Sequence, residues 1–183
     1  PQDLAASGPY GHGIPKTDEE RWQSIDELPF GSLVDVTHKL DGQSWSAFCK
    51  LITHSETPDV TIAMVGVGGR SFLYKLDCDN NYTRNERNYG VLAKLEAFCR
   101  KHNVSLCIRG ESYGGGIQKS AINPHSAAPL SLALYSVWLI DERRYARKND
   151  PFYIHTIASE LGLPVVPVIE RDVVLTPELI KKY

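Results

Sequence analysis

Residues 32–53 read SLVDVTHKLDGQSWSAFCKLIT and contain two runs of β-forming residues. The runs, 32–40 and 44–53, flank the short polar segment 41–43, Asp-Gly-Gln, so we predict a β-hairpin. A third run at 60–67 follows a proline-containing turn. Because these strands succeed one another without an intervening helix, the sequence predicts an α+β domain with a mainly antiparallel sheet flanked by helices.

The rest of the chain alternates helical and extended patterns. Apolar residues recur at helical spacing over 85–102, which predicts a helix that stops at Asn103. The almost entirely apolar run 130–140 predicts a strand buried on both faces. Further expected elements are a strand at 104–108, a sharp turn at 113–116, a helix at 151–161 that stops at Gly162, a strand at 165–169 and a helix from 177 to 183.

The amino-terminal residues have a different pattern. Residues 1–17 mix Gly, Pro, Ser and Ala without periodicity, so we expect an irregular arm. The segment 17–20, Thr-Asp-Glu-Glu, is a capping box and predicts a short helix that ends near Leu28. We therefore divide the chain into an arm with a short helix, 1–29, and one domain, 30–183.

Composition limits the possible classes of protein. With 183 residues and 42% hydrophobic residues the chain can form one core, which excludes a fibrous or wholly disordered protein. The net charge of -2 indicates no bulk attraction to nucleic acid, and no apolar run approaches the ~18 residues of a membrane span. The four cysteines match neither a zinc pattern nor a disulfide framework, so we expect reduced thiols and a cytoplasmic protein. The chain starts at Pro1 rather than Met, and we expect a processed or excised piece.

The segment Lys39-Leu40-Asp41-Gly42 carries residues that can perform chemistry. A lysine amine becomes a nucleophile when desolvation or nearby cations favour its neutral form. Asp41 can orient that amine or hold a hydrated metal ion, and Gly42 lets a phosphate or a sugar approach the backbone. The alternative is a β-turn with an exposed lysine.

Two further positions are candidates for ligand contacts. Glu111, in Arg109-Gly110-Glu111, ends an apolar strand before a glycine cluster, where its carboxylate can meet a ribose hydroxyl or a metal-bound water. Tyr135 lies in the apolar run 132–138, and its ring can stack on a purine. The alternatives are a solvated charge for Glu111 and core filling for Tyr135.

A run of cations follows the apolar strand. Four of the six residues 143–148 are Arg or Lys, which is enough for phosphate contacts. The alternative is a solvated surface, since Asp141, Glu142 and Asp150 lie beside them.

In their order, these pieces resemble the ATP-dependent RNA ligases, a branch of the covalent nucleotidyltransferases. The resemblance covers roughly residues 30–170 and implies a nucleotidyltransferase fold. It implies that Lys39 becomes attached to AMP, that Gly110-Glu111 reads the ribose and shares the metal site, and that Tyr135 stacks on adenine. Gly69-Arg70-Ser71, after a flexible loop opened by Gly66, matches a family pair that contacts the nucleotide. The run 109–118 is most similar to the RNA-joining branch.

The resemblance also implies a complete ligand set. Where the family often has an acidic residue before the lysine, this chain has His38, which can present a ring nitrogen or its backbone. The implied cofactors are ATP and Mg²⁺ or Mn²⁺, with Asp41 and Glu111 holding the metal ion through water. The implied ATP-binding residues are His38, Lys39, Asp41, Gly42, Arg70, Glu111 and Tyr135.

Two family elements do not occur in the sequence. A Glu-Gly followed by apolar residues, and then Lys-x-Lys, are expected after the strand at 165–169, but neither precedes Tyr183, and Lys181-Lys182 lacks the spacing. We therefore expect the amino-terminal part of an adenylation domain, truncated or completed by a second polypeptide. By itself this chain should bind ATP and adenylate its lysine very slowly.

The resemblance implies RNA repair chemistry without a membrane partner. AMP moves from Lys39 to an RNA 5′-phosphate, and a 3′-hydroxyl then displaces it and seals the strand. The open alternatives are a DNA ligase or RNA-capping enzyme, a non-catalytic nucleotide- or RNA-binding module, and an α+β domain in which Lys39, Glu111 and Tyr135 do not converge.

Overall fold

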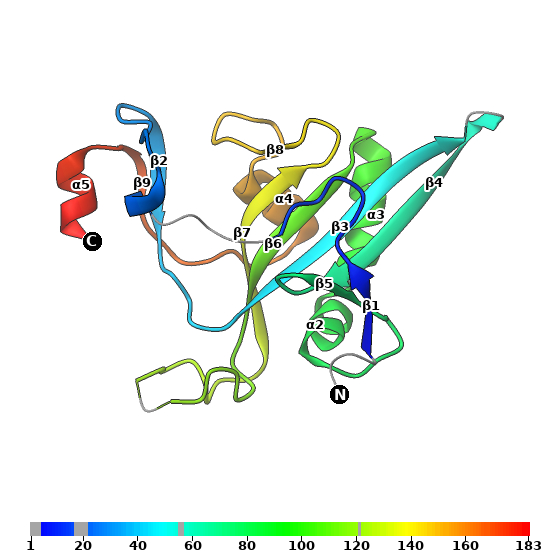
Figure 1. Cartoon of the computed structure of the whole chain (residues 1–183), viewed down its shortest axis with the longest axis horizontal. Helices are drawn as coiled ribbons and strands as arrows, with labels where there is room; N and C mark the ends of the chain where they lie inside the picture. Colours follow the sequence, from blue (N-terminus) through cyan, green and yellow to red (C-terminus); the bar gives the residue numbers. More distant parts are fainter. Residues whose placement is uncertain (1–4, 17–21, 55–56, 121) are drawn as a thin grey trace.

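A seven-stranded antiparallel sheet forms the centre of the molecule (Figure 1). The computed structural model describes residues 5–16, 22–54, 57–120 and 122–183. The strand order is β1-β5-β4-β3-β6-β7-β8, so the predicted α+β class with a mainly antiparallel sheet is confirmed. The strands are β1 (Ala6–Pro9), β3 (Gln43–His54), β4 (Thr57–Gly68), β5 (Phe72–Tyr74), β6 (Leu106–Tyr113), β7 (Ser131–Leu139) and β8 (Arg144–Tyr145).

The predicted hairpin between residues 32–40 and 44–53 is wrong. The first run forms β2 (Leu33–Thr37), which pairs with the distant strand β9 (Val168–Val174) in a separate two-stranded sheet. The second run forms β3, which pairs with β4 and β6. The segment between the runs is not a tight turn, because Gln43 already begins β3 and the backbone amide of Gly42 binds Glu111.

The described residues contain four α-helices beside the strands. The helix expected over 85–102 is divided into two, because Gly90 takes a left-handed conformation with φ of 60°. Asn103 and Gly162 end their helices in the same left-handed conformation, as predicted. The expected strand at 165–169 begins later, at Val168. The helices are α2 (Asn81–Tyr89), α3 (Val91–His102), α4 (Ile154–Leu161) and α5 (Pro177–Lys182).

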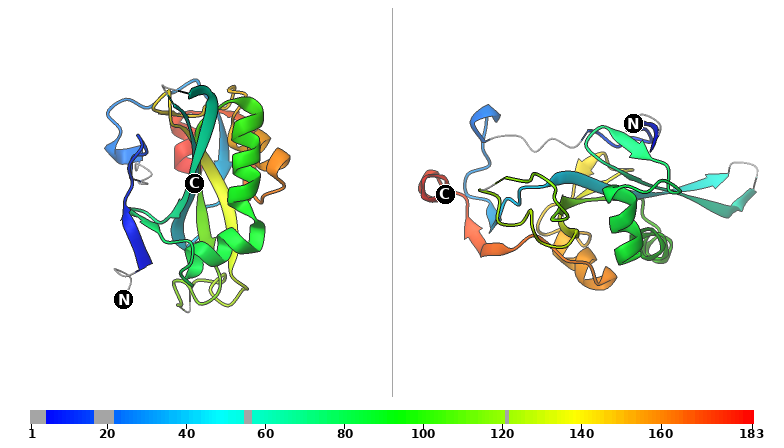
Figure 2. Two further views of the ribbon diagram at one scale, coloured as in Figure 1. Left: turned by 90° about the vertical axis from the view of Figure 1, so that its right-hand side faces the viewer. Right: turned by 90° about the horizontal axis from the view of Figure 1, so that it is seen from below.

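Different segments pack on the two faces of the large sheet (Figure 2). Helices α2, α3 and α4 lie on one face, where Trp45, Leu95 and Ile108 belong to the main hydrophobic core. The opposite face carries a smaller cluster, in which Ile14 of the amino-terminal segment packs with Phe48 of β3. Residues of β7 contribute to clusters on both faces, which confirms the prediction of a doubly buried strand.

The amino-terminal segment is more ordered than predicted. Its residues Ala6–Pro9 form β1, which pairs with β5, so the expected irregular arm is wrong there. The predicted capping box at 17–20 lies outside the described residues. Of the helix expected to reach Leu28, the described residues contain only the 3-10 turn Trp22–Ser24.

Two chemical features of the chain complete the description. Cys49, Cys78, Cys99 and Cys107 are free thiols, as predicted. Among the described residues, no helix has both the length and the hydrophobicity of a membrane-spanning segment.

Candidate active site

The segment between β2 and β3 meets the end of β6. The backbone amide of Gly42 donates a hydrogen bond to the Glu111 carboxylate, with 3.1 Å between N and Oε1. A Cβ at position 42 would lie 3.0 Å from Cγ of Glu111 and would clash with the carbonyl oxygen of Ser112. A glycine is therefore required for this close approach between the lysine segment and β6.

The Glu111 carboxyl has an unusual electrostatic environment. Burial raises the pKa of this half-buried carboxyl above its usual range. The positive charge of Lys39 and the hydrogen bond from Gly42 oppose this shift, whereas the negative charge of Asp41 adds to it. The structure thus brings Lys39, Asp41 and Glu111 close enough for their charges to act on one another near the end of β6.

Tyr135 joins this group through the residue next to the lysine. Leu40 is buried in a cluster with Ala133 and Val166, against which Tyr135 packs. Ala133 pairs with Glu111 across β6 and β7, and Tyr135 packs in the same cluster as Ala133. Lys39, Glu111 and Tyr135 therefore lie on one side of the sheet, which argues against the alternative in which they do not converge.

The lysine itself is held by its neighbours and faces solvent. The His38 amide donates to the carbonyl oxygen of Pro167 at 2.9 Å, so a nucleotide contact by His38 would use its imidazole or its carbonyl. Leu40 anchors the chain on the other side. Lys39 is exposed between these anchors, and Asp41 is exposed directly after Leu40. The amine is accessible to a reactant while its backbone is fixed.

Arg70 is placed at the same end of the sheet by strand register. Gly68, the last residue of β4, pairs with Ser46, and Ser44 pairs with Glu111. The exposed Arg70 follows in the connection between β4 and β5. The flexible loop expected from Gly66 is shorter than predicted, because Gly66 and Gly68 belong to β4.

Two residues at this site have no signal in the sequence. Tyr82 lies at the start of α2, and burial, Tyr74 and the charge of Glu111 together raise its pKa. The buried Asn123 donates from its amide nitrogen to the carbonyl oxygen of Asp41 at 3.2 Å and so connects the glycine-rich loop to the lysine segment. Both roles depend on contacts between distant segments, which composition and spacing do not reveal.

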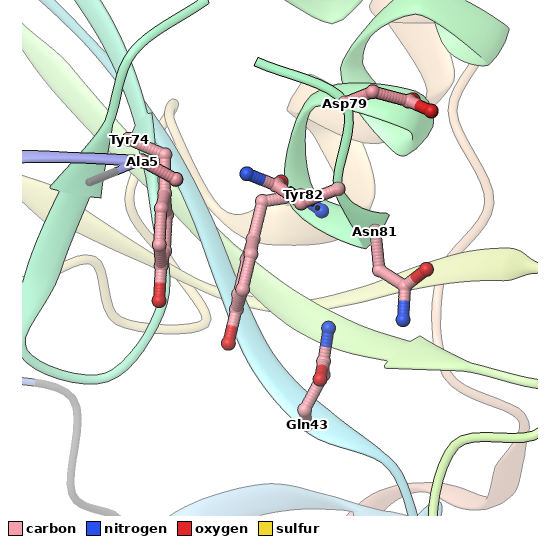
Figure 3. A pocket seen from close by; sticks show the side chains of 7 residues that line it. Ala5, Gln43, Tyr74, Asp79, Asn81 and Tyr82 are labelled. Carbon is pink, nitrogen blue, oxygen red and sulfur yellow. Dashed lines mark hydrogen bonds between the residues drawn. The ribbon is translucent and has the colours of Figure 1, made fainter. Parts of the chain in front are cut away.

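A pocket of about 260 Å³ adjoins the lysine segment (Figure 3). The rings of Tyr74 and Tyr82 stack there with centroids 4.3 Å apart, and Gln43, next to Gly42, faces them from β3. The described lining has no basic side chain and includes neither Lys39 nor Tyr135. This pocket therefore lies beside the candidate active site and does not coincide with it. The residues that line it are Ala5, Gln43, Tyr74, Asp79, Asn80, Asn81 and Tyr82.

Two of the four cations in the run after β7 form internal ion pairs. Arg144 binds Asp150 and Glu142, each at 2.6 Å, and Lys148 binds Asp35 and Asp172. These partners favour a structural role for the two cations over phosphate contacts.

Asp41 and Glu111 are the two carboxylates of the candidate site that could hold a metal ion. Among the described residues there is no cluster of three or more His, Cys, Asp or Glu side chains arranged to hold a metal ion. Asp41 and Glu111 offer two oxygen donors, which suits a divalent cation that keeps several waters. Burial is the main cause of the raised pKa of Glu111 and the charge of Asp41 adds to it, so a bound cation would favour the ionised form of both carboxylates.

Solved structures with the same fold include variants of an RNA ligase from Naegleria gruberi. A variant of Naegleria gruberi RNA ligase with ATP and Mn has a TM-score of 0.72 and 23% identity, over 94% of this chain and 47% of that chain. A second variant with ATP and Mn also has a TM-score of 0.72 and 23% identity, over 96% and 49%. The same ligase with PPi has a TM-score of 0.69 and 23% identity, over 90% and 45%. The chain thus spans about half the length of these ligases, and the likeness shows the fold.

Sequence comparison identifies the family. None of the curated proteins compared with the chain matches it. The RNA ligase family model matches residues 33–182, which include the lysine segment, Glu111 and Tyr135. The match covers most of the chain, and the chain therefore belongs to the RNA ligase family.

Proposed function

We propose that this chain is the nucleotide-binding part of an ATP-dependent RNA ligase and that Lys39 forms its covalent AMP intermediate. One observation carries the proposal: Gly42 binds Glu111 and thereby holds Lys39 and Asp41 against a half-buried carboxylate. The family match and the Naegleria gruberi RNA ligases with ATP and Mn support it.

In the first step the Lys39 amine attacks the α-phosphorus of ATP. A nitrogen–phosphorus bond forms, the bond to pyrophosphate breaks, and the amine gives up a proton. Because Lys39 is exposed but its neighbours are anchored, the protein contributes mainly orientation to this step. Tyr135 offers a ring for adenine, Glu111 an acceptor for a ribose hydroxyl, and Arg70 a positive charge for the nucleotide.

The donor set is suited to Mg²⁺ or Mn²⁺. Asp41 and Glu111 would hold the ion through water, since both provide the carboxylate oxygens that these hard cations prefer. When bound, such an ion offsets the negative charge of the phosphates. Lys39, Tyr135 and Arg70 position the nucleotide, as described above.

Two later steps would complete RNA joining. AMP moves from Lys39 to an RNA 5′-phosphate, and an RNA 3′-hydroxyl displaces it to form the new phosphodiester. The family elements Glu-Gly and Lys-x-Lys would come from a further segment or from a second polypeptide. The coverage of only about half of the Naegleria gruberi chains supports this part of the proposal. We also propose that the ligase acts in RNA repair in the cytoplasm.

The lysine assignment is tested with ATP labelled on its α-phosphate, using the natural full-length protein. Wild type should retain label on denaturing electrophoresis, whereas Lys39→Ala and Lys39→Arg should retain none, because guanidinium stays protonated. Lys94→Ala, at an exposed lysine of α3, is the matched control and should label normally. Persistent labelling of Lys39→Ala would contradict the assignment.

The nucleic-acid substrate is tested by competition between nicked RNA and nicked DNA duplexes. Sealing of RNA in preference to DNA supports the proposal. Preferential sealing of DNA would make the protein a DNA ligase. Binding of ATP or RNA by wild type without any covalent AMP would instead indicate a non-catalytic binding module.

A further inference from the structure

Asp35 has an environment that differs from that of every candidate residue above. It lies in β2, four residues before Lys39, and its side chain is only 3% exposed. Hydrogen bonds reach its carboxylate from several segments that are far apart in the sequence. The hydrogen-bond donors are the Lys148 ammonium, the Tyr153 hydroxyl at 3.0 Å and the Asp172 amide at 3.0 Å, and the His155 ring lies 3.6 Å from the carboxylate.

These partners connect the small sheet to the body of the molecule. Tyr153 is the N-cap residue of α4, a helix whose Ile157 is fully buried in the main core. Lys148 lies between β8 and α4 and also binds Asp172 of β9 at 3.0 Å. Asp35 therefore joins both strands of the small sheet to a helix that is fixed by hydrophobic packing.

Hydrophobic packing holds the small sheet only weakly. The described residues of β2, β9 and α5 contribute none of the buried core, and Leu33 and Val174 are 50% and 49% exposed. Figure 1 shows β2, β9 and α5 set apart from the seven-stranded sheet. The position of the small sheet must therefore depend largely on polar contacts such as those of Asp35.

Only a few residues separate Asp35 from the lysine, and contacts with neighbouring segments fix their backbone. The His38 amide binds the carbonyl oxygen of Pro167, just before β9, and Leu40 packs on Val166. Lys39 lies between these two contacts. A shift of β2 and β9 relative to α4 would consequently move the lysine backbone relative to Glu111, which belongs to the large sheet.

We propose that Asp35 is a positioning residue for the nucleophile: its contacts with Lys148, Tyr153 and Asp172 fix the small sheet and thereby place the Lys39 amine beside Glu111. The inference rests on the proposed function of Lys39. It assigns a role in lysine adenylation to a carboxylate that does not touch the nucleotide.

A purely structural role is separated from positioning by a matched control. Asp150 is also a mostly buried carboxylate, 21% exposed, and it binds Arg144 at 2.6 Å in the same connection as Lys148. It makes no contact with β2 among the contacts of the described residues. Asp150→Asn should therefore cost stability without disturbing Lys39.

The experiment compares wild type, Asp35→Asn, Lys148→Gln and Asp150→Asn in the natural full-length protein. The maximal rate of lysine-AMP formation, the KM for ATP and the hydrogen exchange of residues 36–42 are measured. Asp35→Asn should lower the maximal rate at least about tenfold, which corresponds to about 1.4 kcal/mol, with little change in KM. It should also accelerate exchange in 36–42, whereas Asp150→Asn should change neither quantity.

Lys148→Gln keeps the contacts of Asp35 with Tyr153 and the Asp172 amide and should lower the rate by an intermediate amount. If Asp35→Asn does not fold, this variant is used in its place. A wild-type rate in folded Asp35→Asn, equal losses in Asp150→Asn, or a lower rate with unchanged exchange would each overturn the proposal. If wild type forms no lysine-AMP, the proposed function fails. The exchange data then still decide whether Asp35 orders residues 36–42.

Discussion

The two sheets of this molecule are stabilised in different ways. In the seven-stranded sheet, side chains such as Trp45, Ile108 and Leu134 are fully buried. In the β2–β9 sheet, hydrogen bonds and ion pairs around Asp35 take the place of a core. Lys39 lies on the connection between the two sheets. The position of the proposed nucleophile thus depends on a rigid apolar core on one side and on a polar anchor on the other.

Removing an apolar side chain should have very different consequences in the two sheets. Trp45 is buried and its indole nitrogen donates to the Tyr82 carbonyl oxygen at 3.0 Å. Trp45→Ala should lower the free energy of unfolding by about 3–5 kcal/mol, because it leaves a large cavity in the core. Val174→Ala, in β9, should change it by less than about 1 kcal/mol. Urea unfolding monitored by circular dichroism measures both.

Similar losses of unfolding free energy for Trp45→Ala and Val174→Ala would contradict this difference between the two sheets. They would mean that the small sheet is stabilised by apolar burial after all.

A second prediction concerns the point where the lysine segment contacts the large sheet. Gly42→Ala should displace the segment from Glu111, since the added methyl group meets Ser112 and Glu111. We expect a loss of about 1–3 kcal/mol in unfolding free energy and at least about a tenfold lower rate of lysine-AMP formation. Gly11→Ala is the control, because no heavy atom lies within 4 Å of the added Cβ. Equal rates in the two variants would show that the Gly42–Glu111 contact does not position Lys39.

The smallest expected effect is a difference in pH dependence between two carboxylates. Burial raises the pKa of Glu111. Burial would also raise the pKa of Asp35, but hydrogen bonds from Lys148, the Asp172 amide and Tyr153 outweigh it and lower that pKa. Asp35 should therefore add stability at neutral pH that is lost as the pH falls through its lowered pKa. Glu111 should favour folding below the usual Glu pKa of about 4.3, and this contribution is lost as the pH rises through its raised pKa.

Unfolding free energies of Asp35→Asn and Glu111→Gln between pH 3 and pH 7 test this pair. Relative to wild type, Asp35→Asn should be least stable at neutral pH, and the deficit should shrink on acidification. Glu111→Gln should instead gain stability relative to wild type as the pH rises. Slopes of the same sign would contradict the environments described for these two groups.

The sequence predicts those features of the fold that depend on local conformation. Asn103 and Gly162 end helices because both tolerate the left-handed conformation, and the turn at 114–116 is formed by three glycines with positive φ. The pairing of β2 with β9 was missed, because strand partners more than 130 residues apart leave no mark in a local pattern. The strand β1 was also not predicted, because its partner β5 lies in a distant part of the sequence.

The candidate site was predicted to a similar extent. Lys39, Glu111 and Tyr135 were proposed from their motifs, and the structure places them on one side of the sheet, while their roles stay predictions. Asp35, Tyr82 and Asn123 were missed, because each acquires its role only from contacts with distant segments.

The central claim is that the Lys39 amine takes AMP from ATP. Its most direct test is peptide mass spectrometry of the natural full-length protein after incubation with ATP and a divalent metal ion. The account predicts an acid-labile AMP adduct on the peptide that contains Lys39. An adduct on a different lysine, or none on a protein that still joins RNA, would contradict it.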